Sequence, residues 1–108
     1  MELDLSLENK EIYAGVKIES YGGKKSFELN QGNLNLIGDN IAGYIKKART
    51  EAKAGGDNDK NAASFADVVI LTGATAIPVY LAAFHVVVHN FNEVKYKNEM
   101  YEITIAKH

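Results

Sequence analysis

Two histidines four residues apart have the spacing in this sequence that most resembles a chemical site. His85 and His89 are separated by three valines, and on an α-helix this spacing places both imidazole rings on one face, one turn apart. Two ligands of a single zinc ion need such an arrangement. Because zinc binds neutral imidazole, affinity at such a site would fall in acid. The pair is therefore a candidate metal site with zinc as its cofactor.

The pair lacks the other parts of a hydrolytic zinc site. A metalloprotease helix carries a glutamate beside the first histidine as general base, and valine occupies that place here. A third ligand would come from elsewhere, and spacing does not rank the candidates, which are Asp39, Glu93, Glu99 and His108. The alternative interpretation, which we favour, places both histidines near a helix end, where the helix dipole favours cationic imidazole.

Two further segments begin like binding motifs and then depart from them. Residues 57–61 place oxygen atoms at alternate positions, as a calcium loop does, but Ala62 and Val68 stand where the loop needs glycine and glutamate. Residues 71–77 resemble the strand-to-glycine turn of dinucleotide-binding folds, yet Gly73 is their single glycine. We expect neither calcium nor a nucleotide to bind.

The charge balance disfavours nucleic acid as a partner. The chain has 12 basic and 14 acidic residues, for a net charge of −2, and Arg49 is its one arginine. Planar guanidinium groups are the usual means of recognising phosphate and guanine. A basic cluster on one predicted helix is expected only to keep that helix soluble; it comprises Lys46, Lys47, Arg49 and Lys53. Because the chain has no cysteine and no serine next to a histidine, catalysis is not the favoured function.

Length and composition predict one folded domain over residues 1–108. A hydrophobic share of 46% and a charged share of 24% are ordinary for a globular protein. The first residues carry acidic side chains where a secretory signal needs basic ones. We therefore expect a cytoplasmic protein.

The hydrophobic pattern predicts an α+β fold. Alternation over 2–8 and 12–18, followed by a turn at 22–25 and a short strand at 26–29, predicts a three-stranded antiparallel N-terminal meander. Alternation near the C-terminus predicts a closing hairpin around Asn98 and Glu99. We expect meander and hairpin to form one antiparallel sheet packed against two to three helices.

The helices are expected in the middle of the chain. Steps of three and four predict a helix over 34–52, capped by Asn33 and ending at 55–56, and Ser64 has the position of a second helix cap. Between 68 and 91 there are 24 residues without a charge. We expect two buried helices joined at Pro78, because proline breaks a helix.

Two alternatives for the uncharged run remain open. Its first four residues, 68–71, could form a buried strand, because valine and isoleucine favour strands. The run is also long enough to span a bilayer, but it contains proline, glycine and histidine, and a span would separate strands that need one another. We therefore expect protein to cover the run, and a membrane partner to be absent.

These observations favour a small non-enzymatic protein that binds itself or a protein partner. An all-apolar helix in so small a domain leaves surface to be covered, and homo-oligomers commonly cover it. An adaptor, an inhibitor or a self-associating subunit would use apolar helix surface or a sheet edge; the candidate contact residues are Tyr13, Tyr21, Tyr80 and Phe84. The alternatives are a metal-binding protein or small enzyme using His85 and His89, and a single-pass membrane protein.

Overall fold

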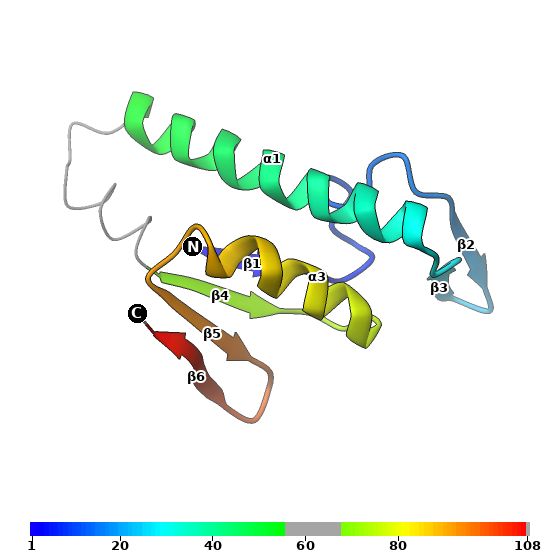
Figure 1. Ribbon diagram of the computed structural model, residues 1–108. Helices are drawn as coiled ribbons and strands as arrows, with labels where there is room; N and C mark the ends of the chain where they lie inside the picture. The colour runs from blue at the N-terminus through cyan, green and yellow to red at the C-terminus, as the bar shows by residue number, and fades with distance from the viewer. Residues whose placement is uncertain (56–67, 108) are drawn as a thin grey trace.

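The computed structural model describes residues 1–55 and 68–107, which form a mixed α+β fold (Figure 1). Its main sheet has four strands in the order β1, β4, β5 and β6. Their bounds are β1 Glu2–Asp4, β4 Val68–Thr72, β5 Glu93–Lys97 and β6 Glu102–Lys107. A separate two-stranded sheet holds β2 Ile18–Tyr21 and β3 Lys24–Phe27, and the helices are α1 Gln31–Gly55 and α3 Ile77–Val88.

The main sheet is partly parallel, which corrects the expected purely antiparallel sheet. Leu3 of β1 pairs in parallel with Leu71 of β4, and Val69 of β4 pairs in parallel with Val94 of β5. Only β6 runs antiparallel to its neighbour. The expected N-terminal meander is also wrong, because β1 leaves the neighbouring residues and joins β4. Alternation in a sequence tells which face of a strand is buried, but it does not identify the strand's partner.

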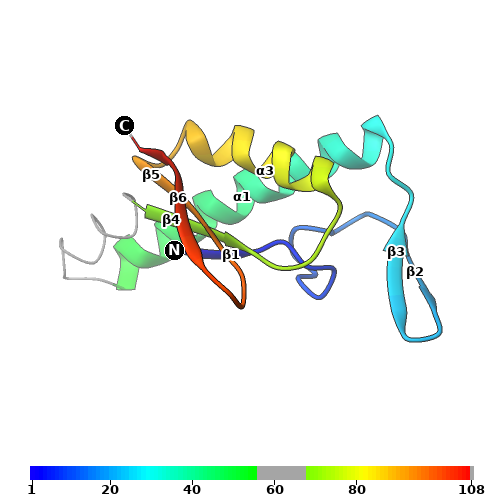
Figure 2. The same ribbon diagram turned by 90° about the horizontal axis from the view of Figure 1, so that it is seen from below.

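Both helices lie on one face of the main sheet (Figures 1 and 2). The chain moves from β1 through α1 to β4, and then from β4 through α3 to β5, so both crossovers step across the sheet in the same direction. Right-handed crossovers that step in one direction place their helices on the same face. The domain therefore has a helical layer and a sheet layer. No helix of residues 1–55 and 68–107 lies over the second face of the sheet, which we call the helix-free face.

The core lies between the two layers. The strands contribute buried side chains that point toward the helices: Leu3, Val69, Leu71 and Val94. The helices meet them with Ile37, Ile41 and Ile45 of α1 and with Val79, Ala83 and Val87 of α3. The helix-free face has Val68 and Ile70 of β4 at its centre and charged residues on the neighbouring strands. Lys95 lies between Glu93 and Glu102 at 4.0 and 3.7 Å, and Lys97 lies 3.8 Å from Glu2.

The first helix confirms the predicted stripe, with an earlier start. α1 begins at Gln31 because Asn30, not Asn33, serves as the cap: its side-chain oxygen accepts a hydrogen bond from the Asn33 main-chain nitrogen at 2.8 Å. The helix ends at Gly55 as expected. The predicted cap at Ser64 lies outside the described residues.

The uncharged run contains one strand and one helix instead of two helices. Residues 68–72 form β4, so the strand alternative is correct. Pro78 does not break a helix but stands in the first turn of α3, where its missing N–H has no helical acceptor to lose. The structure describes no helix long and apolar enough to cross a membrane.

Both predicted hairpin turns are present. Gly22 and Gly23 have φ angles of 56° and 81° between β2 and β3, values that glycine adopts without strain. Between β5 and β6 the side-chain oxygen of Asn98 accepts main-chain hydrogen bonds from Met100 and Tyr101 at 2.8 and 3.0 Å. Such side-chain to main-chain bonds are why asparagine favours turns.

Candidate functional site

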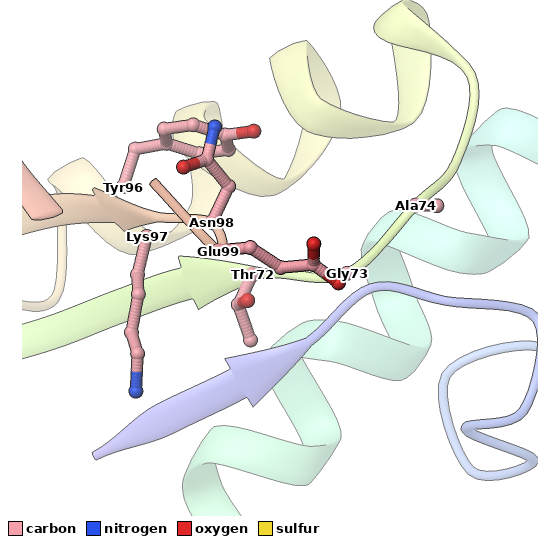
Figure 3. A pocket seen from close by; sticks show the side chains of 7 residues that line it. All are labelled: Thr72, Gly73, Ala74, Tyr96, Lys97, Asn98 and Glu99. Carbon is pink, nitrogen blue, oxygen red and sulfur yellow. The ribbon is translucent and has the colours of Figure 1, made fainter. Parts of the chain in front are cut away.

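Two hollows on the surface of the described residues could hold a ligand or partner. The first is a crevice of about 460 Å³ at the carboxyl ends of β4 and β5 (Figure 3). The second is a shallow groove of about 720 Å³ between the outer faces of α1 and α3. We call the second hollow the helical groove. Its lining includes Gly38, Asp39, Ala42, Leu81, Ala82 and His85.

The crevice at the strand ends is formed by the loop after β4 and the turn after β5. Its charged lining residues are Lys97 and Glu99. The side chain of Glu99 extends toward Gly73, whereas that of Lys97 extends away (Figure 3) and lies 3.8 Å from Glu2. Glu99 and the ring of Tyr96 do not by themselves specify a reaction.

Aromatic rings pack against Tyr96, which lines this crevice. The ring of Tyr96 lies 5.6 Å from that of Tyr80 and 6.0 Å from that of Tyr101, measured between centroids. The Tyr80 hydroxyl donates a hydrogen bond to the main-chain oxygen of Gly73. Burial, with smaller contributions from Tyr96, Asp4 and Tyr13, raises the pKa of Tyr80 to about 12. Tyr80 is therefore a structural support for the loop after β4.

The helical groove combines a recessed floor with protruding apolar side chains. Gly38 and Ala42 of α1 and Ala82 of α3 line it and carry little or no side chain. A Cβ atom on Gly38 would meet no atom of another described residue within 4 Å, apart from the backbone of its own helix. Leu81, which also lines the groove, is 64% exposed, and Ile77 one turn earlier on α3 is 75% exposed. The depression over the small residues and the protruding side chain of Leu81 thus lie side by side on one face of the molecule.

The groove also carries one acidic and one basic side chain. Asp39 comes from α1 and His85 from α3, and both are exposed. The structure therefore places one of the four third-ligand candidates, Asp39, in the same groove as the first histidine. His108 lies outside the described residues.

The histidine pair has the predicted geometry. The ring centroids of His85 and His89 lie 5.2 Å apart with an interplanar angle of 71°, and both side chains are exposed. His85 lies in the last turn of α3 and His89 follows the helix as its C-cap. Within residues 1–55 and 68–107, no group of three or more metal-ligating side chains occurs that could hold an ion. The described residues of one chain thus bring two ligands together, His85 and His89.

The four predicted contact residues, three tyrosines and one phenylalanine, occupy different environments. Tyr13 is buried, and its hydroxyl donates a 2.7 Å hydrogen bond to the main-chain oxygen of Leu5. Burial raises its pKa, partly opposed by the hydrogen bond with Thr75. Tyr21 is 78% exposed at the tip of the β2–β3 hairpin. Tyr80 and Phe84 are half-buried on α3 and pack against the core.

Two members of the predicted basic cluster contact other parts of the fold. The guanidinium carbon of Arg49 lies 4.7 Å from the centre of the Phe91 ring, and Nη2 donates a hydrogen bond to the main-chain oxygen of Asn90. Lys47 lies 3.9 Å from Glu11. Arg49 thus joins α1 to the end of α3 as well as contributing charge to the surface.

Sequence reasoning missed the helical groove. The separation of α1 from α3 along the chain hides their contact, although two signals were present. Gly38 stands in a helix interior, where glycine costs about 1 kcal/mol relative to alanine, and Ile77, Leu81 and His85 recur at intervals of four. Comparison of the chain with protein-family models, curated proteins and solved structures finds no match.

Proposed function

We propose that the protein is a non-enzymatic assembly subunit that pairs with a second copy of itself through the helical groove. The observation that carries this proposal is the exposure of Leu81 and Ile77 beside a floor of Gly38, Ala42 and Ala82. Burying one such side chain fully contributes about 1.5–3 kcal/mol. A second copy would remove both side chains from water on each of the two chains.

Gly38 supports the proposal because it lines the groove and no contact within the described residues requires a glycine there. Among the described residues, no atom beyond the helix's own backbone lies within 4 Å of the Cβ position of Gly38, so alanine fits there and would gain about 1 kcal/mol in helix propensity. Glycine in a helix allows a neighbouring backbone or a large side chain to approach closely. A leucine from outside the chain would use the space that Gly38 leaves.

The occupant that best fits the groove is a second copy of the chain. A two-fold axis brings the same surface of two copies together, so such a surface must carry both the protruding and the recessed part. The helical groove does, and Leu81 of one copy can enter the depression at Gly38 of the other. It also carries Asp39 and His85, so unlike groups can meet across the axis.

Other surfaces support self-association less well. The outer edge of β6 exposes Ile103 and Ile105, but its register with β5 shifts between Val94 and Lys95. A register irregularity of this kind in an edge strand is a common protection against pairing. The helix-free sheet face carries the ion pairs of Lys95 and Lys97.

The test is the molar mass in solution, measured by sedimentation velocity and light scattering over a wide concentration range. The wild-type protein should be a dimer at high concentration. Gly38→Leu fills the depression and should yield monomers. Gly43→Leu is the matched control, because Gly43 also lies within α1 with nothing within 4 Å of its Cβ position but does not line the groove.

A second pair of variants tests the protruding side. Leu81→Lys should yield monomers, whereas Met100→Lys should remain dimeric, because Met100 is 87% exposed on the β5–β6 turn, away from the groove. Circular dichroism should show unchanged helix content in all four variants. A wild-type chain that stays monomeric at every concentration overturns the proposal, and a dimer unaffected by Gly38→Leu and Leu81→Lys refutes the groove as its interface.

A further inference from the structure

We infer that His85 and His89 bind a divalent transition metal, with zinc the best match, at a site that Asp39 of a second copy completes. This inference rests on the proposed pairing through the helical groove. Two of its residues, Asp39 of α1 and His85 of α3, line that groove, and His89 lies beside His85. No ligand is shared between the histidine pair and the strand-end crevice.

The histidine pair is available for a metal. Both side chains are exposed and their ring centroids are 5.2 Å apart, a separation at which the two rings can turn their nitrogen atoms toward one ion. Within the described part of the chain, neither ring forms a hydrogen bond or ion pair. No internal bond would therefore have to break before an ion binds.

The described residues of a single chain leave the site incomplete. Zinc in proteins has at least three protein ligands, drawn from cysteine, histidine and carboxylate, and the described residues of one chain provide no such group of three. Two imidazoles on one helix bind metal weakly unless another ligand joins them. In the proposed pair of chains, a second copy can provide the third ligand.

The proposed docking supplies that ligand. When Leu81 of one copy enters the depression at Gly38 of the other, the next turn of α3 presents His85, and the residue after Gly38 is Asp39. The carboxylate of the second copy is thereby brought to the histidine pair. The two-fold axis repeats this arrangement, so a dimer has two sites, one for each chain.

The donor atoms select the class of metal. Two imidazole nitrogens and one carboxylate oxygen suit zinc and its neighbours copper and nickel, whereas calcium and magnesium prefer oxygen ligands alone. Three protein ligands leave a fourth zinc position for water. The metal would hold the two copies together, since its ligands belong to both.

Zinc titration of the protein without a histidine tag tests the inference, with calorimetry for binding and sedimentation for mass. The wild-type chain should bind about one zinc per chain, and zinc should lower the dimer dissociation constant by about tenfold or more. His85→Ala and Asp39→Asn should each lose most of this affinity. Glu99→Gln is the matched control, because Glu99 is an exposed carboxylate outside the groove, and it should bind zinc as the wild type does.

Mixing two defective variants shows whether the ligands come from different chains. Asp39→Asn keeps its histidines, and the His85→Ala/His89→Ala double variant keeps its Asp39. A mixed dimer therefore contains one intact site, and mixing should restore tight zinc binding that neither variant has alone. Absence of restoration overturns the shared site.

The two proposals can fail separately. A chain that forms groove-dependent dimers in the presence of a chelator and binds no zinc refutes the metal site and leaves the assembly proposal standing. A chain that binds zinc while remaining monomeric refutes the shared site, and if it is also monomeric at every concentration without zinc, it refutes the assembly proposal as well.

Discussion

Gly73 leaves the space that the carboxylate of Asp4 occupies. A Cβ atom on Gly73 would overlap Asp4 Oδ1, and it would lie 2.7 Å from the main-chain nitrogen of Ser6. Asp4 uses this position to accept hydrogen bonds from the Ser6 main-chain nitrogen at 2.8 Å and from its hydroxyl at 3.0 Å. The chain leaving β1 and the chain leaving β4 therefore fit together only if residue 73 has no side chain.

The variant Gly73→Ala should be strongly destabilised. Gly73 has a φ angle of 99°, which side chains disfavour by about 1–2 kcal/mol, and the overlap with Asp4 adds to this cost. We expect the free energy of unfolding in urea to fall by at least about 2 kcal/mol. Gly23→Ala is the control, because φ is 81° there but nothing lies within 4 Å. Equal losses in both variants would show that the close approach to Asp4 is unimportant.

Tyr13→Phe should destabilise the domain through a lost hydroxyl. The Tyr13 hydroxyl donates to the Leu5 main-chain oxygen at 2.7 Å and, having one proton, accepts from the Thr75 hydroxyl at 2.7 Å. Leaving these groups without their partner should lower the free energy of unfolding by about 1–3 kcal/mol. Tyr21→Phe, at an exposed position, should change it by less than about 0.5 kcal/mol. A Tyr13→Phe protein as stable as the wild type would contradict this role.

Alkaline pH should destabilise the fold through Tyr80. Burial raises its pKa from 10.0 to about 12, so the folded state holds the phenolic proton more tightly than the unfolded state does. Stability is then fully present below pH 10 and falls as the pH rises toward about 12. Urea unfolding across this range should show a shallower fall in Tyr80→Phe than in the wild type. Some slope should remain, because burial also raises the pKa of Tyr13. Identical slopes in the two proteins would exclude Tyr80 as the cause.

Arg49→Lys should loosen the junction between α1 and the end of α3. The planar guanidinium lies over the Phe91 ring and donates to the Asn90 main-chain oxygen, a combination that an ammonium group does not reproduce. We expect a loss of about 1–2 kcal/mol in the free energy of unfolding. Lys46→Ala, on the exposed side of the same helix, should change it little. If both variants behave alike, Arg49 contributes only surface charge.

Local structure could be predicted where the signal lies within one element. The three-and-four spacing predicted α1, the glycines at 22 and 23 predicted the β2–β3 hairpin, and Asn98 marked the β5–β6 turn. Each of these depends on residues close together in sequence. The histidine pair has its predicted proximity for the same reason, since both residues follow one helical turn.

Long-range arrangement could not be predicted from the same patterns. The side chains of β1 alternate in the same way whether its partner is the next segment or β4. Pro78 was expected to break a helix, yet it starts one, because proline suits the first turn as well as a break. The helical groove needs α1 and α3 to lie side by side, and only the folded chain brings Gly38 near Leu81.

The pairing of β1 with β4 has a consequence for synthesis of the protein. β1 is made before β4, the strand that must receive it, and about 70 residues separate the two, including α1 and the small hairpin. Until then Leu3 and Leu5 have no finished core to enter. β4 can pair with its other neighbour, β5, earlier, because the connection between them through α3 is shorter than the connection from β1 to β4. We therefore expect the C-terminal half to form the folding nucleus and the first strand to dock last.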